Sequence, residues 1–260
     1  MTTGFGDILR KWRKQRRFSQ LALALDANIS GRHLSFLESG RAKPSRDMVL
    51  RLTRHLDMPK AEVNRTLLAA GLAPAYPTRA PNDTDLLPVH QAVAKLLENH
   101  MPYPAIAINR YWTITHANEA AIGLLEETGF GGYTNLLEAL ASQPPQESNI
   151  INWEEAIGLL LARLRTEMSE MGNDPVFAKL LGELEMQFDM HAEGVDIDYG
   201  QSIIPTKFRT ATGTISLFSS IAQFGTIQDI TLEDLKIELM FPMDDASDRY
   251  LLQQGQDSFR

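Results

Sequence analysis

The sequence predicts two domains: an all-α domain of five helices, and an α+β domain with an antiparallel sheet of about five strands and helices. Helical periodicity fills the first seventy residues, and the first β-rich runs follow residue 104. Charge divides in the same place. Residues 1–80 hold fifteen Lys and Arg against six Asp and Glu (+9), and the remainder holds ten against twenty-seven (−17). A basic domain joined to an acidic one indicates that the first half binds a polyanion.

Composition limits the classes of function that remain. The chain has 260 residues and is 43% hydrophobic, which suffices for two hydrophobic cores. It contains no cysteine, which excludes disulfides, thiolate zinc sites, iron–sulfur clusters and cysteine nucleophiles. Neither a signal peptide nor a membrane span is recognisable, so we expect a cytoplasmic protein that does not contact a membrane.

The first domain, residues 1–72, is predicted from five amphipathic segments. Ser19 and Ser30 each precede a segment and can cap its helix, because a hydroxyl accepts a backbone N–H that has no partner at a helix start. Asn28 stands between these helices at a sharp turn, where Asn tolerates the left-handed backbone conformation. Apolar residues at helical spacing are expected to form the core: Phe5, Ile8, Leu9, Trp12, Leu34, Leu37, Val49, Leu52, Leu56, Val63, Leu67 and Leu68.

The stretch from Ser19 to Arg46 reads as a helix, a tight turn, a second helix and a basic loop. Its motif residues are Gln20, Leu23, Ala24, Asn28, Ile29, Ser30, Leu34, Leu37, Glu38, Gly40 and the RAKPS run at 41–45. This pattern resembles the phage-repressor-like helix-turn-helix family of the xenobiotic-response-element class. In such proteins the second helix lies in the major groove of double-stranded DNA, while the first helix crosses the backbone.

The resemblance assigns roles to single residues. It implies that Arg32, His33 and Ser35 read base edges and that Ser30, which caps their helix, belongs to the same DNA-binding set. It also implies phosphate contacts by Gln20, Arg41, Lys43 and Ser45. One small domain buries too little surface to select a unique genomic site. We therefore expect a homodimer that reads an inverted repeat with half-sites roughly 34 Å apart.

A proline-containing linker, residues 73–83, precedes the second domain, residues 84–260. That domain is expected to begin with a helix over 84–99 and a hairpin whose turn is Asn109-Arg110. The remaining expected elements are a helix from Asn118, helices over 153–171 and 174–188, and strands over 203–209, 213–224 and 236–241. This order suggests a PAS-like sheet with a pocket between sheet and helices.

Two segments of the second domain carry a further resemblance: RYWTITHANEAA from Arg110, and the run from Phe208 to Ser247. With the order of elements between them, they resemble the ligand-binding domain of MmyB-like transcription regulators. The resemblance implies a bacterial regulator whose acidic domain senses a small apolar molecule such as a fatty acid. Candidate pocket residues are Trp112, Met168, Phe177, Leu181, Phe188, Phe218 and Phe224, and the alternative is that each fills the core.

Catalytic and metal-binding patterns are not recognisable. The six histidines include no pair at i, i+4 spacing, and the sequence has neither a phosphate loop nor a glycine-flanked nucleophilic serine. Asp244 and Asp245 could bind a cation but read as solvated loop acids. We expect no enzymatic activity, no metal and no cofactor beyond a bound apolar ligand. Two alternatives to a sensor remain: a constitutive repressor whose second domain only dimerises, and a helix-turn-helix module that binds proteins.

Overall fold

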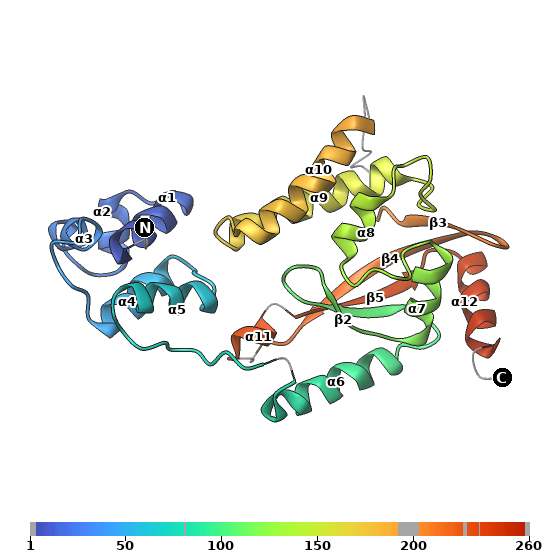
Figure 1. The fold of residues 1–260 in the computed structure, drawn as a ribbon, viewed down its shortest axis with the longest axis horizontal. Coiled ribbons are helices and arrows are strands. Elements are labelled where there is room, and N and C mark those ends of the chain that lie inside the picture. Colours follow the sequence, from blue (N-terminus) through green and yellow to red (C-terminus); the bar gives the residue numbers. More distant parts are fainter. Residues whose placement is uncertain (1–3, 81, 192–202, 226–227, 234, 258–260) are drawn as a thin grey trace. The chain divides into compact units, whose positions relative to one another are not determined.

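The computed structural model describes residues 4–80, 82–191, 203–225, 228–233 and 235–257 (Figure 1). The chain divides into two compact units, and each is described by itself. The first, called the helical unit, contains Met1–Arg79 with Thr166–Asp174 and Gln228–Glu233. The second, called the sheet unit, contains Ala80–Arg165, Pro175–Ile227 and Asp234–Arg260.

Five helices form most of the helical unit, as the sequence predicts. They are α1 (Phe5–Gln15), α2 (Gln20–Asp26), α3 (Gly31–Glu38), α4 (Arg46–His55) and α5 (Lys60–Ala69). Their expected apolar faces are buried in one core, with a single exception. Leu68 was expected in the core but is 59% exposed, because successive helical residues point about 100° apart and Leu67 takes the inward position.

Local hydrogen bonds explain why the helices begin where they do. The Ser19, Ser30 and Ser45 hydroxyls accept the backbone N–H groups of Ala22, His33 and Met48 at 3.0, 3.1 and 3.2 Å. Each such cap stabilises a helix by about 1 kcal/mol. Asn28 has a φ of 51°, so the prediction of a left-handed turn between α2 and α3 is confirmed.

A five-stranded antiparallel sheet organises the sheet unit, and its strand order is β2-β1-β5-β4-β3. The strands are β1 (Ala105–Ile108), β2 (Ile114–Ala117), β3 (Thr206–Thr210), β4 (Gly213–Gln223) and β5 (Lys236–Pro242). The last strand is therefore central: Glu238 pairs with Ile106 of β1 on one side and with Ile221 of β4 on the other. The central position of β5 brings residues that are more than a hundred positions apart in the sequence together on one face of the sheet.

The helices after the linker include three that the sequence did not predict. The helical elements are η1 (Thr84–Leu86), α6 (Leu87–Glu98), α7 (Glu119–Glu127), α8 (Leu136–Ser142), α9 (Trp153–Glu170), α10 (Pro175–His191), α11 (Ile230–Glu233) and α12 (Asp245–Asp257). The unpredicted ones are α8, α11 and α12. Asp244 and Asp245 are exposed, as expected for solvated acids, but they lie at the start of α12: the Asp244 carboxylate accepts the Ser247 N–H at 2.8 Å, and Asp245 is the first residue of the helix.

Asn118 joins three elements of the sheet unit. Its side-chain oxygen accepts the N–H groups of Ala105, at the start of β1, and of Ala121, in α7. Its side-chain nitrogen donates to the carbonyls of Leu97, in α6, and Tyr103. Because the residue is buried and uses both ends of its amide, it does more than cap α7 as expected from sequence. It fixes where the first strand begins.

Candidate DNA-binding helix and ligand cavity

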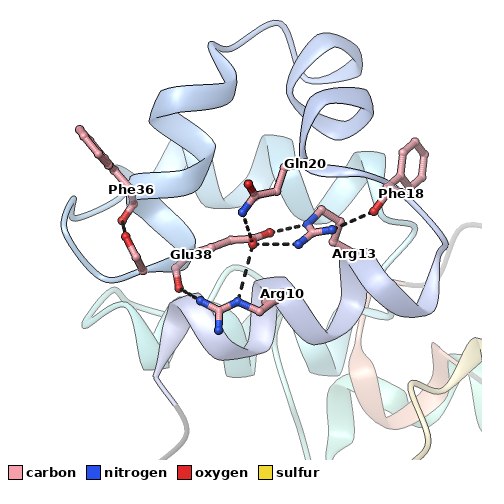
Figure 2. Close-up of polar contacts among 7 residues, drawn as sticks. Arg10, Arg13, Phe18, Gln20, Phe36 and Glu38 are labelled. Atoms are coloured by element: carbon pink, nitrogen blue, oxygen red, sulfur yellow. Dashed lines mark hydrogen bonds and ion pairs between the residues drawn. The ribbon is translucent and has the colours of Figure 1, made fainter.

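A buried ion pair holds the predicted reading helix, α3, against α1 (Figure 2). Arg13 donates from Nε and Nη2 to the two carboxylate oxygens of Glu38, at 2.5 and 2.9 Å. Gln20 of α2 donates to the same carboxylate at 2.8 Å, and Arg10 donates to the Glu38 carbonyl at 2.8 Å. A two-pronged contact of this kind fixes orientation as well as distance. Helices α1, α2 and α3 are thereby tied to one residue, Glu38.

The surroundings of Glu38 keep it charged. Burial by itself raises the pKa of this carboxyl, but hydrogen bonds from Arg13 and Gln20 and the charges of Arg13 and Arg10 outweigh it. The pKa of Glu38 therefore lies below its ordinary value. The Glu38 hydrogen bond likewise raises the pKa of Arg13 against the opposing effect of burial. The pair is ionised at neutral pH.

The residues expected to contact DNA lie on α2, α3 and the loop before α4. Ser30, Arg32, Arg41, Lys43 and Ser45 are exposed, and His33 and Ser35 are half-buried. Gln20 is also half-buried and directs an amide N–H to Glu38, so part of its donor capacity is used inside the unit. The inward positions of α3 are taken by Leu34, Leu37 and Glu38. The sequence prediction of the outward face agrees with this arrangement.

In the sheet unit, a cavity of about 330 Å³ lies between the sheet and helices α7, α8 and α9. Its wall is mostly aliphatic and aromatic, with Leu124, Leu136, Leu160, Ile106 and Met240 as examples. This size falls within the range of natural small-molecule sites, which are largely apolar with a few placed polar groups. The wall also contains a few polar side chains: Thr128, Arg163, Thr206, Ser219 and Glu238.

Trp112 and an ion pair lie together in the cavity wall. Arg163 of α9 donates from Nη1 to Oε1 of Glu238 at 2.8 Å, and its guanidinium carbon lies 4.7 Å from the centroid of the Trp112 ring. The Lys236 Nζ lies 5.9 Å from the same centroid. Lys236 and Glu238 share one face of β5, since strand residues two apart point the same way. Cationic groups therefore gather at this ring.

The backbone of Trp112 is held in an uncommon conformation. Its φ is 63°, a left-handed value that is rare for a bulky residue, and β2 begins only at Ile114. The Trp112 carbonyl accepts the Leu136 N–H at 3.0 Å, and the Asn109 side chain accepts the N–H groups of Tyr111 and Thr113. These bonds maintain a turn that buries the indole in the cavity wall.

Two of the seven predicted ligand-contacting residues, Trp112 and Phe218, line this cavity. The other five, Met168, Phe177, Leu181, Phe188 and Phe224, lie outside its wall. Phe177 and Leu181 are buried in α10, which packs on α8, and Phe188 stacks on Trp153 at a centroid distance of 6.0 Å. The sequence prediction missed Arg163 and Glu238, which are separated by 75 positions and belong to a helix and a strand. Because they are so far apart in the sequence, no local spacing pattern indicates that they form a pair.

Within the described parts of the chain, no group of three or more His, Cys, Asp or Glu side chains could hold a metal ion. Among the helices with described residues, none combines the length and the apolar content needed to cross a bilayer.

Comparisons with known families agree with the two resemblances. The model of the helix-turn-helix domain family matches residues 5–66, which cover α1 to most of α5. A comparison with curated proteins finds no match. The model of the MmyB-like transcription regulator ligand binding domain matches residues 89–253, more than half of the chain and nearly all of the sheet unit. With a helix-turn-helix domain before a ligand-binding domain of this kind, the chain is a transcription regulator and belongs to the MmyB-like family.

Proposed function

We propose that this regulator binds DNA sequence-specifically as a homodimer and that its sheet unit senses a small apolar ligand such as a fatty acid. The observation that carries the ligand proposal is the cavity of about 330 Å³ in the family-matched domain. A largely apolar cavity whose wall contains an ion pair suits a molecule with a hydrocarbon body and one polar head. In this proposal the hydrocarbon contacts Leu124, Leu136 and Leu160, and the head points to Arg163.

The DNA proposal rests on charge and exposure in the helical unit. Arg32, His33 and Ser35 read bases from α3, with Ser30 at its start, whereas Gln20, Arg41, Lys43 and Ser45 contact phosphates. Neutralising phosphates supplies most of the affinity and makes it depend on salt. Base contacts add sequence discrimination of about 1–3 kcal/mol for each good pair. For the ligand to alter DNA binding, the dimer must have two arrangements of its DNA-binding domains, and the ligand must bind these two arrangements with unequal affinity.

The ligand experiment is native mass spectrometry of the full-length protein, before and after solvent extraction. A discrete mass excess that disappears on extraction and returns with added fatty acid supports the sensor. A Leu160→Trp variant fills the cavity and should lose this uptake. A protein that takes up no fatty acid after extraction would favour a second domain that only dimerises, and light scattering would then report its oligomeric state.

The DNA experiment compares two single variants of the full-length protein. Arg32→Ala should reduce sequence preference more than total binding, because base contacts carry the sequence information. Lys43→Ala should weaken binding to all duplexes alike and lower the dependence on salt by about one counterion. An affinity that does not fall as salt rises would contradict DNA binding and favour a protein partner.

A further inference from the structure

One aromatic side chain of α3 is placed unlike the apolar residues around it. Phe36 follows Arg32 by four positions, so the two lie on the same face of the helix, about 40° apart. Arg32 is exposed and Phe36 is half-buried, while Leu34 and Leu37 on the opposite face are fully buried. The ring is therefore displayed on the face that also carries Arg32, one of the predicted base readers.

Phe36 does not belong to the core of the helical unit. Phe18 and Ile29 are also half-buried, and both pack against the core cluster of this unit. Phe36 is absent from the half-buried residues that pack against this cluster in the described part of the unit. Figure 2 shows its ring directed away from the Glu38 network. Core packing thus gives no reason for an aromatic residue at this position. The ring is thus available to a partner that brings an apolar group to this face of α3.

Two guanidinium groups flank the ring. The guanidinium carbon of Arg32 lies 5.3 Å from the ring centroid, and that of Arg41 lies 6.0 Å from it. The Phe36 carbonyl accepts the N–H groups of Arg41 and Ala42 at 2.9 and 3.2 Å, which holds the loop after α3 beside the helix. An apolar ring beside two cations forms a surface that fits a polyanion carrying an apolar group.

The major groove of DNA offers one such group. Thymine presents a 5-methyl group there, and it is the apolar feature that side chains such as Phe recognise. We propose that Phe36 is a specificity residue that contacts a thymine methyl group in each half-site, with Arg32 directed at the neighbouring base pair. This inference rests on the proposed function, because it requires α3 to enter the major groove.

The test removes one methyl group at a time from the DNA. A preferred half-site is first selected from random duplexes with the full-length protein. Each thymine is then replaced singly by deoxyuridine, which keeps the base pair and deletes only the methyl group. We expect one position per half-site where this change weakens wild-type binding roughly three- to fivefold, the factor for one buried methyl group. At that position, Phe36→Ala should bind thymine and uracil duplexes equally.

Two further variants serve as controls. Leu68→Ala removes an exposed apolar side chain from α5 and should leave the thymine preference unchanged. Phe36→Leu keeps an apolar side chain at the position and should retain part of the preference, and it replaces Phe36→Ala should that variant fail to fold. Circular dichroism of each variant reports whether the helices are intact.

The possible outcomes separate this inference from the function on which it rests. A wild-type protein that binds DNA but is indifferent to every thymine methyl would overturn the inference alone. So would a Phe36→Ala variant that keeps the wild-type ratio at the sensitive position, or one that loses affinity for all duplexes alike with that ratio intact. The last result would make the ring a support for Arg32 and Arg41. Absence of salt-dependent DNA binding by the wild type would overturn the proposed function as well.

Discussion

Each unit contains an Arg–Glu pair with a short hydrogen bond, and the two pairs differ in their surroundings. Arg13 and Glu38 have side chains 10% and 1% exposed, and the Glu38 carboxylate accepts from both Arg13 and Gln20. Arg163 and Glu238 are 29% and 9% exposed and line a cavity. The first pair joins three helices at their contact. The second pair places charged groups in the wall of a cavity that is large enough for a ligand.

An Arg–Glu pair can serve two different roles, depending on its surroundings. A buried pair with its hydrogen bonds satisfied restricts motion, because removing either partner leaves an unpaired charge in the interior. A pair at a cavity wall exposes polar atoms that another molecule can engage. We therefore expect variants of the first pair to affect stability and variants of the second to affect ligand binding.

Glu38→Ala should give the largest loss of stability. The change leaves the Arg13 guanidinium buried without its carboxylate, and breaking such a pair costs about 3–5 kcal/mol. Urea unfolding of the full-length protein measures the loss, and hydrogen exchange of the α1 and α3 segments assigns it to the helical unit. A loss below about 1 kcal/mol would mean that the pair does not hold these helices together.

Acid should weaken the helical unit through the same carboxyl. The pKa of Glu38 is lowered in the folded state, so its contribution to stability is complete above its unfolded pKa of about 4.5. That contribution disappears as pH falls through the lower folded value. Glu38→Gln already lacks the charge and should show a flatter decline of stability below pH 4.5. Unfolding at several pH values with both proteins tests this, and parallel curves would contradict it.

The helical unit was more predictable from sequence than the cavity, for a physical reason. Ser19, Ser30 and Asn28 act on backbone groups within a few residues, so the local sequence indicates the helix starts and the turn. The pair of Arg13 and Glu38 spans 25 positions and was not predicted, although Glu38 was recognised as part of the motif. Local determinants thus predicted the elements but not the bond that fixes their packing.

In the sheet unit, long-range pairing decides the site. The central place of β5 brings Glu238 between β1 and β4, and the sequence gives the strands without giving their order. The predicted pocket residues were chosen for being large and apolar. Phe177 and Leu181 meet that criterion yet pack in α10, because helical periodicity shows which residues are buried but not what covers them. Trp112 was predicted, but its left-handed backbone was not.

Arg163→Gln should have an intermediate effect, and on binding more than on stability. Glutamine can still donate a hydrogen bond to Glu238 but has no charge for an anionic head group, so fatty-acid affinity should fall by about 5- to 30-fold. Because Arg163 is partly exposed, stability should change by less than about 1 kcal/mol. Titration calorimetry with a fatty acid measures the loss of affinity. The same titration with the matching alcohol shows whether that loss depends on the carboxylate.

Arg165→Gln is the matched control for that measurement. Arg165 lies two residues further along α9, is exposed, pairs with Glu185, and does not line the cavity. Its replacement should leave fatty-acid affinity unchanged. If both variants lose affinity equally, a general charge effect of α9 would explain the result better than a head-group contact at Arg163. If neither does, the ligand's polar end lies elsewhere.

The smallest effect is expected at a third pair, which lies at the surface. Lys179 and Glu183 are i, i+4 neighbours on α10, with side chains 78% and 44% exposed and an N–O distance of 3.7 Å. Solvent and salt screen such a pair, so Glu183→Gln should cost about 0.3–0.5 kcal/mol at low salt and almost nothing at 1 M. The Glu38→Gln effect should persist at high salt, because the interior excludes the screening ions. If the effects of the two variants depend equally on salt, exposure does not determine how strongly salt weakens each pair.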